Sequence, residues 1–162
     1  MPCACGPQTR STSLSLPRQS TKASVSQDVR AAVQVFVDRY QRRFDLAAFL
    51  TLYADEVVFH DHRLNVTVEG RDALGEFLDW GNPEFELQDP SAGTLTVDEV
   101  EVEGRRAELR GSFLPFRWRG ESYGTMSFRI QLRFDEELRI VRQDDWIEYP
   151  PGLLGVESTA GV

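Results

Sequence analysis

The sequence predicts a single α+β domain in which a curved antiparallel sheet wraps around three N-terminal helices. Apolar residues recur at helical spacing only in the first half of the chain, up to about residue 81. The second half alternates apolar and polar residues in four long segments separated by turns, which is typical of strands with one buried face. A length of 162 residues, 41% of them hydrophobic, suffices for one core and is short for two ordinary domains.

The helices are predicted from apolar stripes and capping residues. Ser26 is expected to cap the first helix. The buried stripe of that helix is predicted to consist of Val29, Ala32, Val33, Phe36, Val37, Tyr40 and Phe44. Asp45 is placed to cap a short second helix over residues 46–53. A third helix covers Ala73 to Leu78 and ends before Gly81-Asn82-Pro83, whose turn chemistry does not allow it to continue.

The strands follow from β-branched and aromatic residues in alternation. Two short strands are expected at residues 57–62 and 65–69. Four long strands are expected after the third helix, at residues 94–102, 107–116, 122–134 and 138–149. Turns at Gly104, at Gly120 and at residues 135–137 separate the long strands, so consecutive strands are expected to pair as an antiparallel meander that bends around the helices.

Both ends of the chain are expected to lie outside the domain. Residues 1–26 form a predicted disordered leader, because residues 1–27 are rich in Ser and Thr and contain no acidic residue. Organelle transit peptides share this composition, so a targeting role stays open beside the expected cytoplasmic location. The domain is predicted to span residues 27–149, with a flexible tail at residues 150–162.

The composition argues against several classes of function. Acidic residues outnumber basic residues by 26 to 18 and no long run of Lys or Arg occurs, so nucleic acid is not an expected partner. No apolar run reaches the length of a membrane span, so no membrane partner is expected either. Cys3 and Cys5, with only His60 and His62 besides, are too few for a zinc site, and we expect no metal.

Three segments, in this order, resemble one protein family: Leu52–Asp61, Gly70–Leu74 and Ile140–Trp146. Over about residues 27–149 the chain resembles the SnoaL-like branch of the nuclear transport factor 2-like superfamily. The resemblance implies a conical barrel whose mostly apolar pocket holds a small hydrophobic organic ligand, without a cofactor. It also implies homodimers that form through the outer face of the sheet. Members of this fold include isomerases, cyclases, dehydratases, epoxide hydrolases and binding domains, so the activity has to be argued from the site.

The same resemblance implies Asp61 and Asp145 as catalytic residues. Asp61 falls on the base of ketosteroid isomerases, and Asp145 falls on a catalytic Asp of limonene-type epoxide hydrolases. The oxyanion donors of the isomerases match Phe36 and about Ile130, which cannot donate a hydrogen bond. The Arg-x-Asp pair of the hydrolases is missing from residues 107–113. Polyketide cyclases need only one carboxylate or His in a pocket, which this chain could supply.

Strand alternation separates the candidate residues by face. Asp61 shares a face with Phe59, and Asp145 shares a face with Gln143, whereas His60 lies on the face opposite Asp61. The predicted substrate-binding residues are Phe59, Tyr53, Phe36, Gln143, Trp118 and His60. Structural roles stay open for both acids: Asp61 could bind backbone at a strand end, and Asp145 could pair with a strand arginine such as Arg110 or Arg129.

Two hypotheses for the function follow from these residues. The first is a cofactor-free acid/base catalyst, of cyclase, isomerase or hydrolase type, acting on a small hydrophobic carbonyl or epoxide compound. The alternative is a non-catalytic ligand-binding or dimerisation module of the same fold. The feature that discriminates between them is whether Asp61 and Asp145 converge in one dry interior with a raised pKa, or face solvent among arginines.

Overall fold

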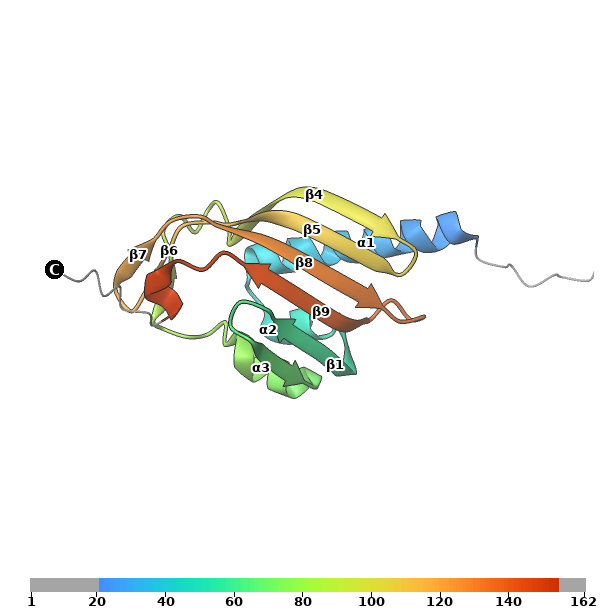
Figure 1. Cartoon of the computed structure of the whole chain (residues 1–162), viewed down its shortest axis with the longest axis horizontal. Coiled ribbons are helices and arrows are strands. Elements are labelled where there is room, and N and C mark those ends of the chain that lie inside the picture. The colour runs from blue at the N-terminus through green and yellow to red at the C-terminus, as the bar shows by residue number, and fades with distance from the viewer. Residues whose placement is uncertain (1–20, 155–162) are drawn as a thin grey trace, which may run out of the picture.

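The computed structural model describes residues 21–154 and has the predicted α+β architecture. Its main layer is a long curved sheet, and helix α1 (Lys22–Arg42) runs lengthwise along one face of it (Figure 1). Helix α2 (Leu46–Leu50) leads from α1 into the first strand, and helix α3 (Arg71–Leu78) lies beside that strand. Cys3, Cys5 and most of the predicted leader lie outside the described residues, as does the chain after residue 154.

The strands of residues 21–154 form two sheets. The larger sheet has the strand order β2-β1-β9-β8-β5-β4, and the smaller has the order β3-β6-β7. The strands are β1 (Tyr53–Asp61), β2 (Val66–Glu69), β3 (Phe85–Leu87), β4 (Leu95–Glu103), β5 (Arg106–Phe113), β6 (Phe116–Trp118), β7 (Glu121–Tyr123), β8 (Met126–Phe134) and β9 (Ile140–Ile147).

The pairing of the long strands confirms the predicted meander. β4 pairs with β5, β5 with β8 and β8 with β9, all antiparallel. Gly104 occupies the β4–β5 turn with φ 57°, a left-handed conformation that glycine adopts without strain. β9 also pairs with β1, in parallel, a contact that periodicity could not predict. This parallel pair places the first and last strands of the domain side by side.

The prediction for Gly120 was wrong in one respect. Gly120 does not connect two long strands, because β5 ends at Phe113 and β8 begins only at Met126. The residues between them form the hairpin β6–β7, which pairs with β3 in the smaller sheet. Pro115 explains the interruption, since proline has no N–H for a strand ladder. Its carbonyl instead accepts a hydrogen bond from the Gln88 N–H at 3.1 Å.

The start of α1 also differs from the prediction. The helix begins at Lys22, and its cap is Thr21, whose hydroxyl accepts a hydrogen bond from the Ser24 N–H. Ser26 lies inside the helix, and its Oγ accepts from the Gly104 N–H at 3.2 Å, so that it ties α1 to the β4–β5 turn. Residues 22–26, expected in the leader, therefore belong to the helix. The Asp45 cap of α2 is confirmed, because its Oδ1 accepts from the Ala48 N–H at 3.0 Å.

Aromatic rings join the helices to the sheet at the centre of the core. On α1, Phe36 and Tyr40 lie against Phe49 of α2, with ring centroids 5.4 and 5.2 Å apart. Phe49 in turn meets the ring of Tyr53, at the start of β1, edge-on at 5.5 Å. Trp80, after α3, stacks on Tyr40 at 5.9 Å. The buried rings of Phe36, Tyr40, Phe49 and Tyr53, with the partly buried Trp80, fix α1 and α2 against β1.

The segment after β9 begins with a short helix, in the region where the sequence predicts a tail. Residues Pro151–Leu154 form a short 3-10 helix, and Leu153 packs against the core. Tyr149 lies between β9 and this helix and is half-buried. No helix within residues 21–154 is both long and apolar enough to cross a membrane.

The close approach of β5 to β4 predicts a strict requirement for glycine at position 111. A Cβ atom there would collide with the Thr96 carbonyl oxygen and lie 2.9 Å from Cζ of Phe128. We expect Gly111→Ala to lower the free energy of unfolding by about 2 kcal/mol or more, because backbone cannot yield to the added methyl group. Gly124→Ala is the matched control, since nothing lies within 4 Å of its Cβ position. Urea denaturation of both variants tests this, and an equal effect of the two substitutions would contradict it.

Candidate functional site

The parallel pairing of β1 with β9 brings two acidic side chains together in the interior. Asp61 and Asp145 are direct partners in the register of the two strands, whose backbones in a sheet run about 4.8 Å apart. The two residues are only 1% and 2% exposed. Strand alternation placed Asp61 on the face of Phe59 and Asp145 on the face of Gln143 without deciding which face is buried, and the structure buries both acids side by side.

Asp145 is held by a short chain of buried polar groups. Gln143 donates a hydrogen bond from Nε2 to Oδ1 of Asp145 at 2.9 Å, and the Tyr53 hydroxyl donates to Oε1 of Gln143 at 2.7 Å. Burial raises the pKa of Asp145 to about 8, although the bond from Gln143 opposes the shift, and the nearby charge of Asp61 raises it further. Asp145 therefore keeps a proton at neutral pH, in a position fixed by Gln143.

Asp61 has a different set of partners, all of them donors. Its Oδ1 accepts hydrogen bonds from the backbone N–H groups of Arg63 and Leu64, both at 2.9 Å. Its Oδ2 accepts from the Tyr149 hydroxyl at 2.5 Å. Burial and this bond to Asp61 raise the pKa of Tyr149, so the hydroxyl stays neutral and able to donate. The three donors suit an ionised carboxylate, and one oxygen of Asp61 also shapes the turn after β1.

Strand arginines do not neutralise the pair within the described part of the chain. Arg110 pairs with Glu99 and Glu108 on the outer face of the sheet. Arg129 lies over the ring of Trp146 at 4.0 Å, also on the outer face. An ion pair with Asp145, the structural role that the sequence left open, is therefore not formed by either residue.

The other predicted site residues divide into two groups. Phe36, Tyr53, Phe59 and Gln143 are buried in the same interior as the acids. His60 points outward, where Nδ1 contacts the Thr67 hydroxyl at 2.7 Å. Trp118 lies in the smaller sheet, half-buried, with Arg119 over its ring at 5.4 Å. None of the described contacts of His60 or Trp118 reaches the acids, and their roles in substrate binding stay predictions.

Two tyrosines near the acids were missed as functional candidates. Tyr149 was predicted only as the end of a strand, and no local pattern marks its contact with Asp61. Tyr40 lies one helical turn after Phe36, on the same buried stripe. Burial and the charge of Asp145 raise its pKa, so its hydroxyl stays neutral. The sequence signal for Tyr40 is that it carries the hydroxyl one helical turn after Phe36, the position that cannot donate.

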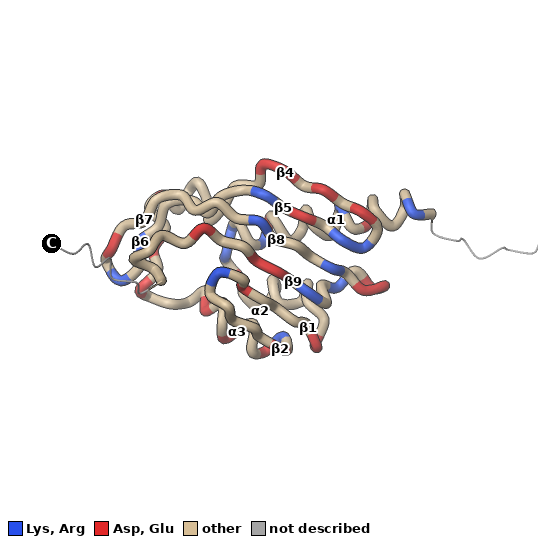
Figure 2. The backbone as a smooth tube through the Cα atoms, viewed as in Figure 1, with Lys and Arg blue, Asp and Glu red and all other residues tan. Residues whose placement is uncertain are grey.

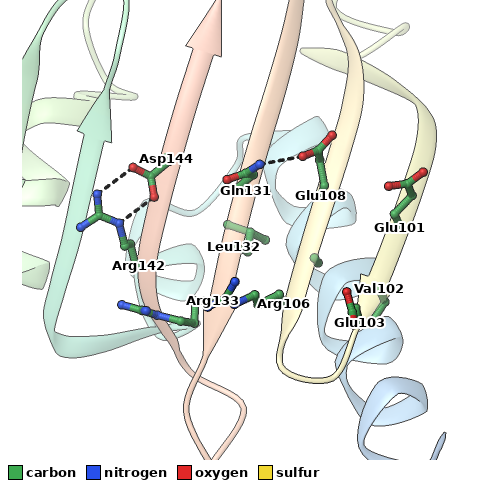
Figure 3. A pocket seen from close by; sticks show the side chains of 11 residues that line it. Glu101, Val102, Glu103, Arg106, Glu108, Gln131, Leu132, Arg133, Arg142 and Asp144 are labelled. Atoms are coloured by element: carbon green, nitrogen blue, oxygen red, sulfur yellow. Dashed lines mark hydrogen bonds and ion pairs between the residues drawn. The ribbon is translucent and has the colours of Figure 1, made fainter.

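The hollows described on the molecule lie away from the acids. The largest, the outer groove, has a volume of about 570 Å³ and runs across the outer face of β4, β5, β8 and β9 (Figure 3). It is lined by Glu101, Val102, Glu103, Arg106, Ala107, Glu108, Gln131, Leu132, Arg133, Arg142 and Asp144. The other three lie at β3–β6–β7, between α1 and β4, and at the α1–α2 junction. None of the four is lined by Asp61 or Asp145.

Comparison with known protein families gives a match over most of the domain. The family model described as SnoaL-like domain matches residues 33–149, which include both acids and Tyr149. No curated protein sequence matches the chain.

Several solved structures share the fold. A proposed SnoaL-like polyketide cyclase from Shewanella putrefaciens superposes with a TM-score of 0.62 at 16% identity, over 75% of this chain and 90% of that chain. An epoxide hydrolase from M. tuberculosis, similar to the limonene type, superposes with a TM-score of 0.59 at 13% identity, over 75% of this chain and 84% of that chain. A steroid delta-isomerase from Pseudomonas aeruginosa superposes with a TM-score of 0.56 at 20% identity, over 79% of this chain and 86% of that chain. At such identities the likeness establishes the fold and leaves the activity to the site.

The raised pKa of Asp145 predicts a pH dependence of stability that has the opposite sign from that of most carboxylates. Between about pH 4, where an unfolded Asp ionises, and pH 8, only the folded chain keeps this proton. The contribution of Asp145 to stability therefore falls as pH rises, by about 1.4 kcal/mol per unit, and levels off above pH 8.

Urea denaturation across pH 4–9 gives the free energy of unfolding of the wild type and of Asp145→Asn. The difference between the two values measures the contribution of Asp145 at each pH. We expect the variant to gain stability relative to the wild type as pH rises to 8. Asp144→Asn, on the opposite face of the same strand, is the control and should show no such gain. Parallel curves for the wild type and Asp145→Asn would show that Asp145 ionises normally.

Proposed function

The chain belongs to the SnoaL-like domain family, and we propose that it is a cofactor-free acid/base catalyst that acts on a small hydrophobic carbonyl or epoxide compound. The reaction is of the cyclase, isomerase or hydrolase type. The observation that carries this proposal is the buried pair of Asp61 and Asp145, in which the pKa of Asp145 is raised to about 8. A carboxyl group that exchanges its proton near neutral pH is what general acid/base catalysis needs.

The two acids are suited to opposite roles. Asp145 carries a proton and donates it to the carbonyl or epoxide oxygen of the substrate. Asp61, which accepts hydrogen bonds from three donors, takes a proton from a carbon atom or from water. Neighbouring groups whose environments separate their protonation states in this way are a recurrent arrangement in acid/base enzymes.

Tyrosine and glutamine side chains support these roles. Gln143, itself oriented by Tyr53, keeps Asp145 in one position. We assign the Tyr40 hydroxyl, which its raised pKa keeps neutral, as a donor for negative charge that develops on the substrate oxygen. It would replace the donor that Phe36 cannot provide.

The surroundings of the acids favour a substrate with an apolar body. Ile130 of β8 stands directly opposite Asp145 in the sheet, and Phe59 precedes Asp61 on the same face. Phe36 and Ile147 are also buried in this interior. The low polarity of these surroundings maintains the raised pKa of Asp145.

The alternative is a dimerisation module, and the position of the largest hollow favours it. The outer groove carries Glu101, Glu103 and Glu108 on β4 and β5, and Arg133 on β8 (Figures 2 and 3). Arg106 on β5 is a further arginine of the groove, and Arg142 on β9 is paired with Asp144. A second copy related by a twofold axis would set Arg133 of each copy against the acidic residues of the other. We propose a homodimer through this face. The homodimer is compatible with either function, because Asp61 and Asp145 lie on the opposite face of the sheet.

Catalysis is tested by conversion of the small molecules that copurify with the protein. Mass spectrometry identifies these compounds, and each one, with related carbonyl and epoxide compounds, is incubated with the protein. We expect turnover by the wild type and a loss of about 10²- to 10⁴-fold in Asp145→Asn, because one proton-transfer group is removed. Asp144→Asn should retain activity. Equal turnover by the wild type and Asp145→Asn would refute the proposed role of Asp145.

The homodimer is tested by sedimentation equilibrium of the wild type and Arg133→Glu. We expect the wild type to sediment at twice the monomer mass and the variant to dissociate, since like charges would then face each other across the outer groove. Arg30→Glu, an exposed substitution on α1, is the control. A monomeric wild type, or a dimer unaffected by Arg133→Glu, would rule out pairing through this face.

A further inference from the structure

Within residues 21–154, two buried polar side-chain atoms have no hydrogen-bond partner, and both lie at the C-terminal end of α1. They are Nε of Arg43 and Oγ1 of Thr94. Arg43 is the residue that ends the helix. Thr94 is 3% exposed, and its backbone N–H donates to the Gln41 carbonyl at 2.9 Å, which fixes it beside the last turn of the same helix. Buried polar atoms are rarely left without a partner, so two of them at one place indicate a missing ligand.

The backbone of Arg43 is unusual for its residue type. Its φ of 52° and ψ of 36° lie in the left-handed region, where the residue after a helix is most often glycine. Residues with a Cβ atom are disfavoured in this conformation, because the Cβ atom approaches the following carbonyl oxygen. The conformation directs the guanidinium group into a half-buried position instead of leaving it in solvent at the helix end.

Aromatic rings hold the guanidinium group of Arg43 but do not satisfy its donors. Its Cζ lies 4.1 Å from the ring centroid of Phe85 and 5.7 Å from that of Trp80. Such contacts engage the flat face of the group and leave the N–H groups at its edge free. Among the described residues, no ion pair joins Arg43 to a carboxylate. Burial lowers the pKa of Arg43, and the charge of Asp79 opposes this shift.

The same rings connect Arg43 to the acids through a series of contacts. Trp80, which lies beside Arg43, stacks on Tyr40. Tyr40 contacts Phe49, whose ring meets that of Tyr53. Tyr53 donates a hydrogen bond to Gln143, the partner of Asp145, so the contacts extend from Arg43 to Asp145.

We propose that Arg43 and Thr94 form an anion-binding subsite, and that the ligand of this protein is an amphipathic anion with an apolar body and a carboxylate or similar group. Both free atoms belong to hydrogen-bond donors, and a guanidinium group matches the two oxygens of a carboxylate. Trp80 and Phe85 supply apolar surface for the body of the ligand. The inference rests on the proposed function only in assigning this anion as the substrate of Asp61 and Asp145.

A local cation is needed for such a ligand because the chain as a whole repels anions. Its formal net charge is −8 at pH 7. An amphipathic anion would therefore bind against the overall field unless a positive group without a protein partner received it. Arg43 meets this condition, whereas arginines of the sheet such as Arg110 and Arg142 are already paired with acids.

Calorimetric titration with straight-chain carboxylates from hexanoate to dodecanoate, and with their methyl esters, tests the subsite. We expect the wild type to bind at least one carboxylate about tenfold or more tighter than its ester, as a hydrogen-bonded charge requires. Arg43→Gln should abolish this preference, and Thr94→Val should reduce it several-fold. Arg42→Gln, which removes the same charge from the adjacent exposed residue, should leave the preference intact.

Arg43→Gly is a second variant, used in case Arg43→Gln misfolds. Glycine suits the left-handed backbone at this position, and the substitution also removes the guanidinium group. It should retain the melting temperature of the fold and lose the preference for carboxylates. Absence of any such preference in the wild type, across the whole series, overturns the proposal. So does a preference that persists in both Arg43 variants.

The two proposals fail in different experiments. Carboxylate preference that depends on Arg43 but persists in Asp145→Asn supports the subsite, whether or not any compound is converted. Turnover that depends on Asp145, in a protein that does not distinguish carboxylates from esters, supports the catalyst and overturns the subsite.

Discussion

Burial of two adjacent carboxyl groups is the constraint around which the interior of this protein is organised. β1 and β9 run in parallel, and their register sets Asp61 beside Asp145 with almost no exposure. Two unpaired negative charges at this separation would be costly in an apolar interior. The structure resolves the cost by leaving a proton on Asp145 and by surrounding Asp61 with donors. The positions of the buried Tyr53 and Gln143 and of the half-buried Tyr149 follow from these two requirements.

Much of the fold was predictable because it depends on local patterns. Helical spacing located α1 and α3, Asp45 marked the start of α2, and alternation identified the long strands and the residues that share a face with Asp61 and with Asp145. Patterns of this kind were less informative where two local signals compete. Ser26 is a good capping residue, yet the helix extends past it to Thr21, and Pro115 divides what alternation alone predicted as one strand.

The candidate site was less predictable, because its contacts join residues that are distant in the sequence. The bond from Tyr149 to Asp61 spans 88 positions, and the bond from Tyr53 to Gln143 spans 90. The parallel pairing of β1 with β9 creates both, and no periodicity specifies that pairing or its register. Arg43 was equally hidden, because an arginine at the end of a helix ordinarily faces solvent. The sequence does not show that its Nε is buried without a hydrogen-bond partner, because this depends on where the rings of Trp80 and Phe85 lie.

The protonation state of Asp145 connects the fold to the proposed chemistry, and it can be observed directly. Carbon-13 NMR of aspartate-labelled protein, titrated from pH 4 to pH 10, follows each carboxyl carbon, and the spectrum of Asp145→Asn assigns the resonance. We expect the Asp145 resonance to titrate near pH 8. A midpoint near pH 4, the ordinary value for an exposed Asp, would show that Asp145 is ionised at neutral pH and would contradict its role as the proton carrier.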